Sequence, residues 1–158
     1  MTIDRNTLNY RKSTTAVIVN KENKILLTQK REYYDNEWDF PGGGVEENET
    51  DEQTILRELY EELGTNKFII IKKSSRIDKY EWPNEVVERK LLEKGKTWRG
   101  QQRSQFLVKY LGDSSSINIQ QDELKKAIWV NIKESFKYLV FPNQLKHTKE
   151  LFKEFELL

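Results

Sequence analysis

The segment from residue 43 to residue 65 constrains this chain most, because it places carboxylates at helical spacing directly after a glycine-rich turn. On a helix, Glu58, Glu61 and Glu62 occupy positions i, i+3 and i+4, so they share one face and repel one another. An ordinary surface helix would mix lysines among them. Oxygen ligands on a rigid element suit Mg²⁺ or Mn²⁺, and ions held in this way usually act on phosphates. The segment therefore predicts a metal-binding acidic helix rather than a merely solvated one.

The same segment also shows how this helix would pack. Its apolar residues recur at every fourth position and would face the core: Ile55, Leu59 and Leu63. Thr50 or Asp51 can cap the start of the helix, and Gly64 can end it as a glycine just beyond the last turn. The helix is therefore expected to be buried on one side and acidic on another.

Apolar runs on both sides of the acidic helix predict strands. We expect them at residues 15–19, 25–29, 68–71, 75–82, 104–110 and 127–130. The charged segment 85–99 is expected to be a long loop or partly helical. Two helices are expected near the end of the chain, at about 132–139 and 144–157. Strands around one central helix, followed by a terminal helix, predict an α/β fold with an α/β/α sandwich.

The composition fits one domain covering residues 1–158 and argues against several classes of protein. No apolar run is long enough to span a bilayer, and the first residues lack the apolar core of a secretory signal. The absence of cysteine excludes disulfides, a thiolate zinc site and a thiol nucleophile, and it fits a cytoplasmic location. The net charge of +1 provides no overall attraction to nucleic acid, so any contact with RNA would be local.

The acidic segment resembles the signature of the Nudix hydrolase family, G-x5-E-x7-R-E-U-x-E-E-x-G-U, in which U is a bulky apolar residue. The positions in register are Gly43, Glu49, Arg57, Glu58, Leu59, Glu61, Glu62 and Gly64. Thr65 departs from the pattern, at a packing position that a threonine methyl can partly fill. The resemblance implies the Nudix fold, an α/β/α sandwich with a mixed central sheet. It also implies an enzyme that hydrolyses a phosphoanhydride bond in a nucleoside diphosphate linked to another group.

The resemblance implies a role for the polar residues of the motif. The expected ligands of Mg²⁺ or Mn²⁺ are the Gly43 carbonyl and the carboxylates of Glu58, Glu61 and Glu62. Glu49 and Arg57 are expected to form an ion pair that orients the acidic helix, as residues behind a metal site often do. Glu49 and Arg57 are therefore expected to orient the metal ligands and to take no direct part in the hydrolysis.

A further glutamate is implied by the same comparison. Relatives place a glutamate facing the metal, as ligand or general base, six residues before a tryptophan, and Glu123 precedes Trp129 by that interval. Asp122 is adjacent, so a slip of the loop by one residue would exchange the two. The expected catalytic residues are Glu58, Glu61, Glu62 and Glu123, and the choice of general base among them stays open.

A looser resemblance covers most of the chain, from residue 10 to about residue 130, and indicates one branch of the family. It lies in segments 10–11, 38–41, 80–83, 94–95, 98–101 and 105–107. This branch contains asymmetric diadenosine tetraphosphate hydrolases and bacterial RNA 5′-pyrophosphohydrolases. The resemblance implies cleavage of diadenosine tetraphosphate to ATP and AMP, with release of pyrophosphate from triphosphorylated RNA 5′ ends as the alternative.

Residues 103–106 replace the usual Q-K-W-F of the branch, so the phosphate contacts of its lysine and tryptophan are lost unless Arg103 replaces them. Two departures weaken the RNA alternative itself. Residues 141–144 replace a basic stretch that the RNA enzymes tend to carry. The turn also reads P-G-G-G, whereas many RNA enzymes have glutamine at its middle position. A dinucleoside polyphosphate is therefore the preferred substrate at this stage.

The residues expected to contact substrate are Arg11, Arg31, Tyr80, Gln101 and Arg103. The planar fork of an arginine suits phosphate, and Tyr80 could stack on a purine, although an aromatic residue alternating along a strand is as often part of the core. The lone His147 is expected to be a surface residue rather than a base.

A reading from another class is a Nudix domain that binds nucleotide without turnover. Such domains normally lose a glutamate of the motif, and this chain keeps all of them. The expected partners are a nucleotide polyphosphate or an RNA 5′ end, with no membrane, and the protein is expected to be a monomer or a homodimer.

Overall fold

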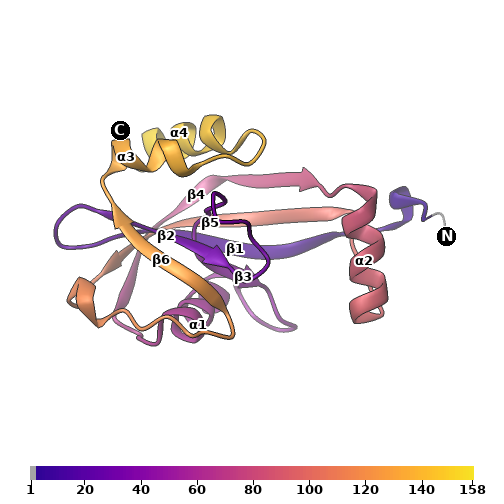
Figure 1. Cartoon of the computed structure of the whole chain (residues 1–158), viewed down its shortest axis with the longest axis horizontal. Coiled ribbons are helices and arrows are strands. Elements are labelled where there is room, and N and C mark those ends of the chain that lie inside the picture. Colours follow the sequence, from indigo (N-terminus) through magenta and orange to yellow (C-terminus); the bar gives the residue numbers. More distant parts are fainter. Residues whose placement is uncertain (1–2) are drawn as a thin grey trace.

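The structure, a computed structural model that describes residues 3–158, contains a six-stranded mixed sheet with helices on both faces (Figure 1). The strands are β1 (Tyr10–Val19), β2 (Ile25–Lys30), β3 (Gly42–Gly44), β4 (Phe68–Glu81), β5 (Gly100–Tyr110) and β6 (Leu124–Val130). The α-helices are α1 (Asp51–Leu63), α2 (Asn84–Lys94), α3 (Ile132–Ser135) and α4 (Gln144–Glu154). Short 3₁₀ turns are η1 (Arg5–Thr7), η2 (Ser114–Ser116) and η3 (Phe136–Tyr138). Within the described range, no helix is both long and apolar enough to cross a membrane.

The strands follow the order β4-β5-β1-β2-β6, and β3 pairs with β1 beside this path. The pair β1–β5 is parallel, whereas the other neighbours are antiparallel. Helix α1 lies against one face, and α3 and α4 lie against the other (Figure 1). The expected α/β/α sandwich with a mixed sheet is therefore confirmed.

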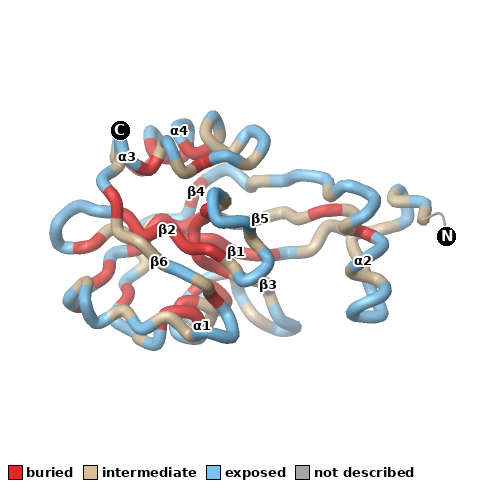
Figure 2. The backbone as a smooth tube through the Cα atoms, in the orientation of Figure 1, coloured by how far each residue is buried: buried red, intermediate tan, exposed pale blue. Residues whose placement is uncertain are grey.

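Two apolar layers hold the helices to the sheet, and alternate residues of β1 feed both. Ala16 and Ile18 pack toward α1, whereas Val17 packs toward α4. The first layer buries the three apolar residues predicted for the acidic helix: Ile55, Leu59 and Leu63. The second layer takes Leu151 and Phe152 from α4. A strand covered on both faces is buried along most of its length, as the central buried stretch in Figure 2 shows.

Local signals set the limits of α1. The Thr50 side chain accepts a hydrogen bond from the Gln53 amide at 3.1 Å, and the Gln53 side chain accepts one from the Thr50 amide at 2.9 Å. This reciprocal capping box satisfies two donors at the start of the helix. Gly64 ends the helix in the left-handed region, with φ of 69°. Thr50, rather than Asp51, is therefore the capping residue.

The pairing of β1 with two strands positions the acidic helix. Ser13, Thr14 and Thr15 pair with the glycines of β3, whereas β2 pairs with β1 at Val19. The glycine turn therefore lies beside the first half of β1 and is held directly against α1, where the Gly42 amide donates to Glu62 at 2.9 Å.

The structure corrects several predicted boundaries. The two strands expected at 68–71 and 75–82 form the single strand β4, whose register is irregular between Lys73 and Ile77. At this irregularity, Ser74 and Ser75 donate to the Glu154 carboxylate of α4, at 2.5 and 2.8 Å. The polar residues of this bulge are the ones that the sequence pattern predicted to separate two strands. Most of segment 85–99 belongs to α2, and the helix expected at 132–139 is α3 followed by η3.

Candidate active site

Arg57 ties the loop after β3 to the acidic helix. Its Nε and Nη2 donate to Glu49 at 2.6 and 2.9 Å, and Nη2 also donates to the Gly44 carbonyl at 3.0 Å. The hydrogen bonds from Arg57 lower the pKa of Glu49 to about 2, so this carboxyl stays charged at neutral pH. The predicted ion pair between Glu49 and Arg57 is thus present. It is bidentate, and two parallel hydrogen bonds fix the orientation of the guanidinium.

The remaining nitrogen of Arg57 contacts the acidic face of α1. Nη1 lies 3.0 Å from Glu58 and 3.2 Å from Glu61. Burial raises the pKa of Glu58, and the adjacent arginine partly offsets that effect. One guanidinium therefore neutralises much of the like-charge repulsion that the sequence predicts for this face.

Glu62 is the most deeply placed carboxyl of the motif, with only 2% of its surface exposed. It accepts a hydrogen bond from the Gly42 amide at 2.9 Å. Burial raises its pKa to about 8, with further contributions from the charges of Glu58 and Glu123, and Lys30 acts in the opposite direction. A buried carboxyl of this kind is stabilised in its charged form by a nearby cation.

Lys30 is a residue that sequence analysis missed. It ends β2, and its Nζ donates to the Gly42 carbonyl at 3.2 Å. Its charge lowers the pKa of both Glu62 and Glu58. No motif marks this lysine, because its proximity to the acidic helix arises only when β2 and the glycine turn fold together.

The donor set fits a hard divalent cation. All of its predicted members are oxygens, and Gly43 allows the closest approach, since a Cβ on that residue would lie 2.2 Å from the Glu58 carboxyl carbon. Within residues 3–158, no three acidic or imidazole side chains converge on one point as they stand, because Glu58 and Glu61 turn toward Arg57 and Glu62 toward Gly42. Binding of a metal ion would therefore draw Glu58 and Glu61 away from Arg57.

The loop before β6 brings the fourth predicted carboxyl to the same place. Glu123 and Glu61 line one shallow depression, together with Tyr60 of α1. The charge of Glu123 also contributes to the raised pKa of Glu62. Residues 61 and 123 are far apart in sequence, so only the fold places their carboxyls together.

Three of the predicted substrate contacts meet on the other side of the glycine turn. Arg11 donates to the Gln101 side chain at 3.0 Å, and Gln101 donates to the Tyr80 hydroxyl at 2.6 Å. The guanidinium of Arg11 lies beside Gly44, because a Cβ there would be 2.4 Å from Nη2. Tyr80 as a whole is 37% exposed, so it is a surface residue rather than part of the core. Arg11, Gln101 and Tyr80 therefore form a row of side chains that begins beside Gly44 and ends at the exposed Tyr80.

Arg103 and Arg31 lie in different surroundings. Arg103 donates to Asp39 at 2.8 Å and to Asp78 at 2.6 Å, and its guanidinium lies 5.5 Å from the centre of the Tyr80 ring. Direct contact of Arg103 with a phosphate would require exchange of these carboxylates, so the position favours support of Tyr80. Arg31 is exposed and donates to the Gln121 carbonyl, close to the Glu123 loop.

His147 is less exposed than expected. Its Nε2 lies 2.8 Å from the Gln105 side chain, and 27% of its side chain is exposed. The contact joins α4 to β5 on the face away from the acidic helix.

Comparison with known proteins gives a NUDIX domain match over residues 9–153. The chain belongs to the Nudix family. An RNA pyrophosphohydrolase of Sphingopyxis alaskensis is 30% identical over 146 residues, covering 87% of this chain and 88% of that protein. An RNA pyrophosphohydrolase of Rickettsia prowazekii is 30% identical over 153 residues, covering 96% and 92%. The chain is thus a Nudix pyrophosphohydrolase, an enzyme that acts on acid anhydrides and uses a divalent metal ion.

Solved structures confirm the Nudix fold. The Escherichia coli dihydroneopterin triphosphate pyrophosphohydrolase matches with a TM-score of 0.69 at 20% identity, over 90% of this chain and 96% of that one. A Caenorhabditis elegans Ap4A hydrolase matches with a TM-score of 0.64 at 21% identity, over 92% and 95%. At these identities the likeness concerns the fold.

Gly43→Ala is expected to weaken metal binding without unfolding this Nudix enzyme. The added Cβ would displace the mobile end of Glu58 rather than backbone. We expect the activating metal concentration to rise at least tenfold, roughly the range seen when the support of a metal ligand is altered. Metal titrations of turnover test this.

Gly44→Ala is the matched control, because its Cβ would instead meet Arg11 and should raise KM at unchanged metal affinity. Equal metal requirements for both variants would contradict the assignment of Glu58.

Proposed function

We propose that this Nudix enzyme releases pyrophosphate from triphosphorylated RNA 5′ ends, with Mg²⁺ or Mn²⁺ as cofactor. The observation that carries the proposal is the position of Arg11, between the acidic helix and the row formed by Gln101 and Tyr80. A nucleotide with a polyphosphate would place its phosphates at Arg11 and its base at the Tyr80 ring. We favour RNA over a dinucleotide because relatives about 30% identical over most of the chain are RNA pyrophosphohydrolases.

The proposed chemistry divides between carboxylates and cations. Glu58, Glu61, Glu62 and Glu123, with the Gly43 carbonyl, would hold the metal ion. Such an ion supplies charge neutralisation on the phosphoryl oxygens and a lower pKa for the attacking water. One of these glutamates accepts the proton of that water as the new P–O bond forms and the anhydride P–O bond breaks. Arg11 balances the negative charge that the leaving phosphate acquires.

Dinucleoside polyphosphates, which the sequence analysis placed first, are the second candidate substrate. The specific observation in their favour is the segment 141–144, which lacks the basic residues that the RNA enzymes of the branch tend to carry. The metal chemistry is the same for both substrates.

The reading as a silent nucleotide-binding domain finds no support, because each carboxyl of the motif is present. A cytoplasmic location and a monomeric or dimeric state stay predictions.

A side-by-side product assay tests the proposal. Triphosphorylated RNA and diadenosine tetraphosphate are each incubated with the enzyme and Mg²⁺ or Mn²⁺, with a chelator as the negative control. Faster release of pyrophosphate from RNA supports the first candidate. Faster formation of ATP and AMP replaces it with the second, and a lack of turnover of either would overturn both candidates.

A further inference from the structure

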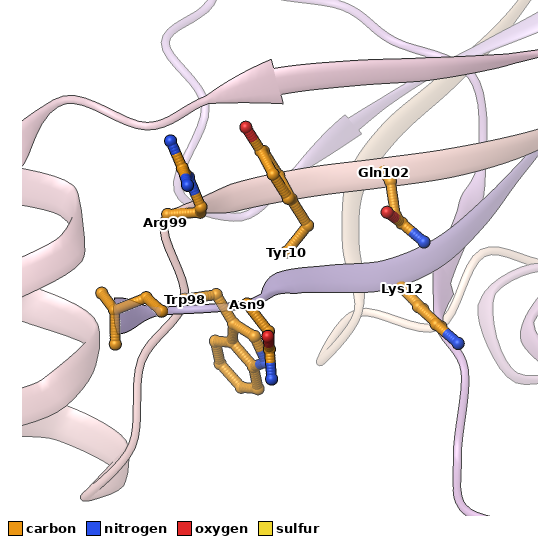
Figure 3. A pocket seen from close by; sticks show the side chains of 7 residues that line it. Asn9, Tyr10, Lys12, Trp98, Arg99 and Gln102 are labelled. Atoms are coloured by element: carbon orange, nitrogen blue, oxygen red, sulfur yellow. The ribbon is translucent and has the colours of Figure 1, made fainter. Parts of the chain in front are cut away.

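A polar groove of about 670 Å³ lies where β1 and β5 begin, at the end of the sheet that carries α2 (Figures 1 and 3). Its lining includes Asn9, Tyr10, Lys12, Trp98, Arg99 and Gln102, and none of the residues that line it is acidic. Figure 3 shows these side chains arising from the two neighbouring strands and the loop before β5. The groove therefore combines hydrogen-bonding and cationic groups with aromatic rings.

Further cations pack against the two rings of the groove. Lys79 Nζ lies 4.3 Å from the centre of the Tyr10 ring, and Arg99 covers the same ring at 5.0 Å. Lys96 Nζ lies 5.4 Å from the Trp98 ring. The cations lie closer to the Tyr10 ring than to the Trp98 ring, which is half-buried.

The lysines around this groove are available to an anion. The ion pairs that lysines form within residues 3–158 involve Lys73 and Lys125, and not the amino groups of Lys12, Lys79 or Lys96. The neighbouring carboxylate Glu81 is already engaged, since it accepts hydrogen bonds from Arg5, Arg99 and Tyr10. The charge at this end of the sheet is therefore locally positive, in a chain whose net charge is only +1.

The groove begins where the metal-binding loop ends. The Lys12 carbonyl accepts a hydrogen bond from the Val45 amide at 3.0 Å. Arg11 lies beside Gly44 on one side and 6.0 Å from the centre of the Trp98 ring on the other. A polymer with its terminal phosphates at the acidic helix can therefore continue into the groove.

We propose that this groove binds the single-stranded RNA body behind the 5′ end. Its backbone phosphates lie against Lys12, Lys79 and Lys96, and one base stacks on Trp98. Proteins that hold single strands without reading sequence use this combination of a cationic groove and an aromatic platform. The inference rests on the proposed RNA substrate, and it adds a dependence on RNA length that the acidic helix alone cannot produce.

A binding experiment without hydrolysis tests the groove. Fluorescence anisotropy measures the affinity of the whole protein for a labelled RNA of about twelve nucleotides, within the usual site size for single strands, that carries a 5′-hydroxyl. The double variant Lys79→Gln/Lys96→Gln is expected to bind about tenfold more weakly. Loss of two phosphate contacts should also reduce the slope of log affinity against log salt by about 1.4. Lys21→Gln/Lys24→Gln is the matched control, because these lysines lie in the turn at the other end of β1.

The outcomes separate the groove from the proposed function. Weaker binding by the groove variant with unchanged binding by the control supports the inference, and equal binding by both overturns it. A Trp98→Leu variant with unaltered affinity would overturn the stacking contact. Binding of RNA that depends on the groove, together with hydrolysis of dinucleotides alone, would overturn the RNA pyrophosphohydrolase proposal and leave the groove standing as an RNA site.

Discussion

Glu62→Gln is expected to lower turnover by several orders of magnitude while raising the stability of the metal-free protein at neutral and alkaline pH. Turnover falls because a proposed ligand to the metal ion loses its charge. Stability rises because folding no longer requires this carboxyl to take up a proton at neutral pH, or to carry a buried charge at alkaline pH. The amide oxygen of glutamine can still accept the hydrogen bond that the Gly42 amide makes at 2.9 Å.

The pH dependence of this effect follows from the pKa of Glu62, which burial raises from 4.5 to about 8 in the folded state. Below about pH 4.5 the group is protonated in both states, and it costs no stability. Between that pH and about 8 the unfolded chain loses the proton while the folded one retains it, so stability falls as pH rises. At about 1.4 kcal/mol per pKa unit the effect reaches at most roughly 5 kcal/mol.

Thermal unfolding in the presence of a chelator, from pH 4 to pH 9, measures this directly. The unfolding temperatures of Glu62→Gln and the wild type should nearly coincide at the acid end and separate as pH rises. Glu52→Gln, on an exposed part of the same helix, is the control and should show no such separation. Added Mg²⁺ should stabilise the wild type more than the variant. A constant difference at every pH would show that Glu62 is ionised in the metal-free fold.

Arg57→Lys is expected to lower kcat/KM by about 10- to 100-fold, the usual range for groups that support a metal site. Lysine keeps the positive charge but lacks the planar guanidinium. The guanidinium donates two hydrogen bonds to Glu49 and one to the Gly44 carbonyl. The loop that carries the Gly43 carbonyl is then less well held, and Glu58 and Glu61 lose the group that spaces them. Steady-state kinetics at a series of metal concentrations should show a higher metal requirement as well as a lower maximal rate.

Arg76→Lys is a suitable control, because Arg76 forms an exposed ion pair with Glu150 at 2.8 Å, far from the acidic helix. Surface pairs of this kind contribute little to stability, so that variant should behave as the wild type. Wild-type kinetics for Arg57→Lys would mean that charge alone holds the loop. Loss of stability without a change in metal requirement would make Arg57 a purely structural residue.

The sequence predicted the acidic helix well because the forces that form it are local. Thr50 and Gln53 cap it, Gly64 ends it, and Leu59 faces the core as its spacing indicates. The same reasoning failed at residues 72–74, where a polar stretch in β4 was predicted to separate two strands. Its polar groups are satisfied by Glu154, which follows them by about eighty residues, and no local pattern reveals such a partner.

By itself, the sequence determined which groups form the acidic face of α1, because helical periodicity alone places Glu58, Glu61 and Glu62 together. Only the tertiary structure decided how those groups are charged and what surrounds them. Burial against the glycine turn raises the pKa of Glu62, and Lys30 reaches the same turn from another strand. The cationic groove likewise arises only where the ends of β1 and β5 meet. Periodicity acts over one turn of helix, whereas burial and electrostatics depend on segments that folding alone brings together.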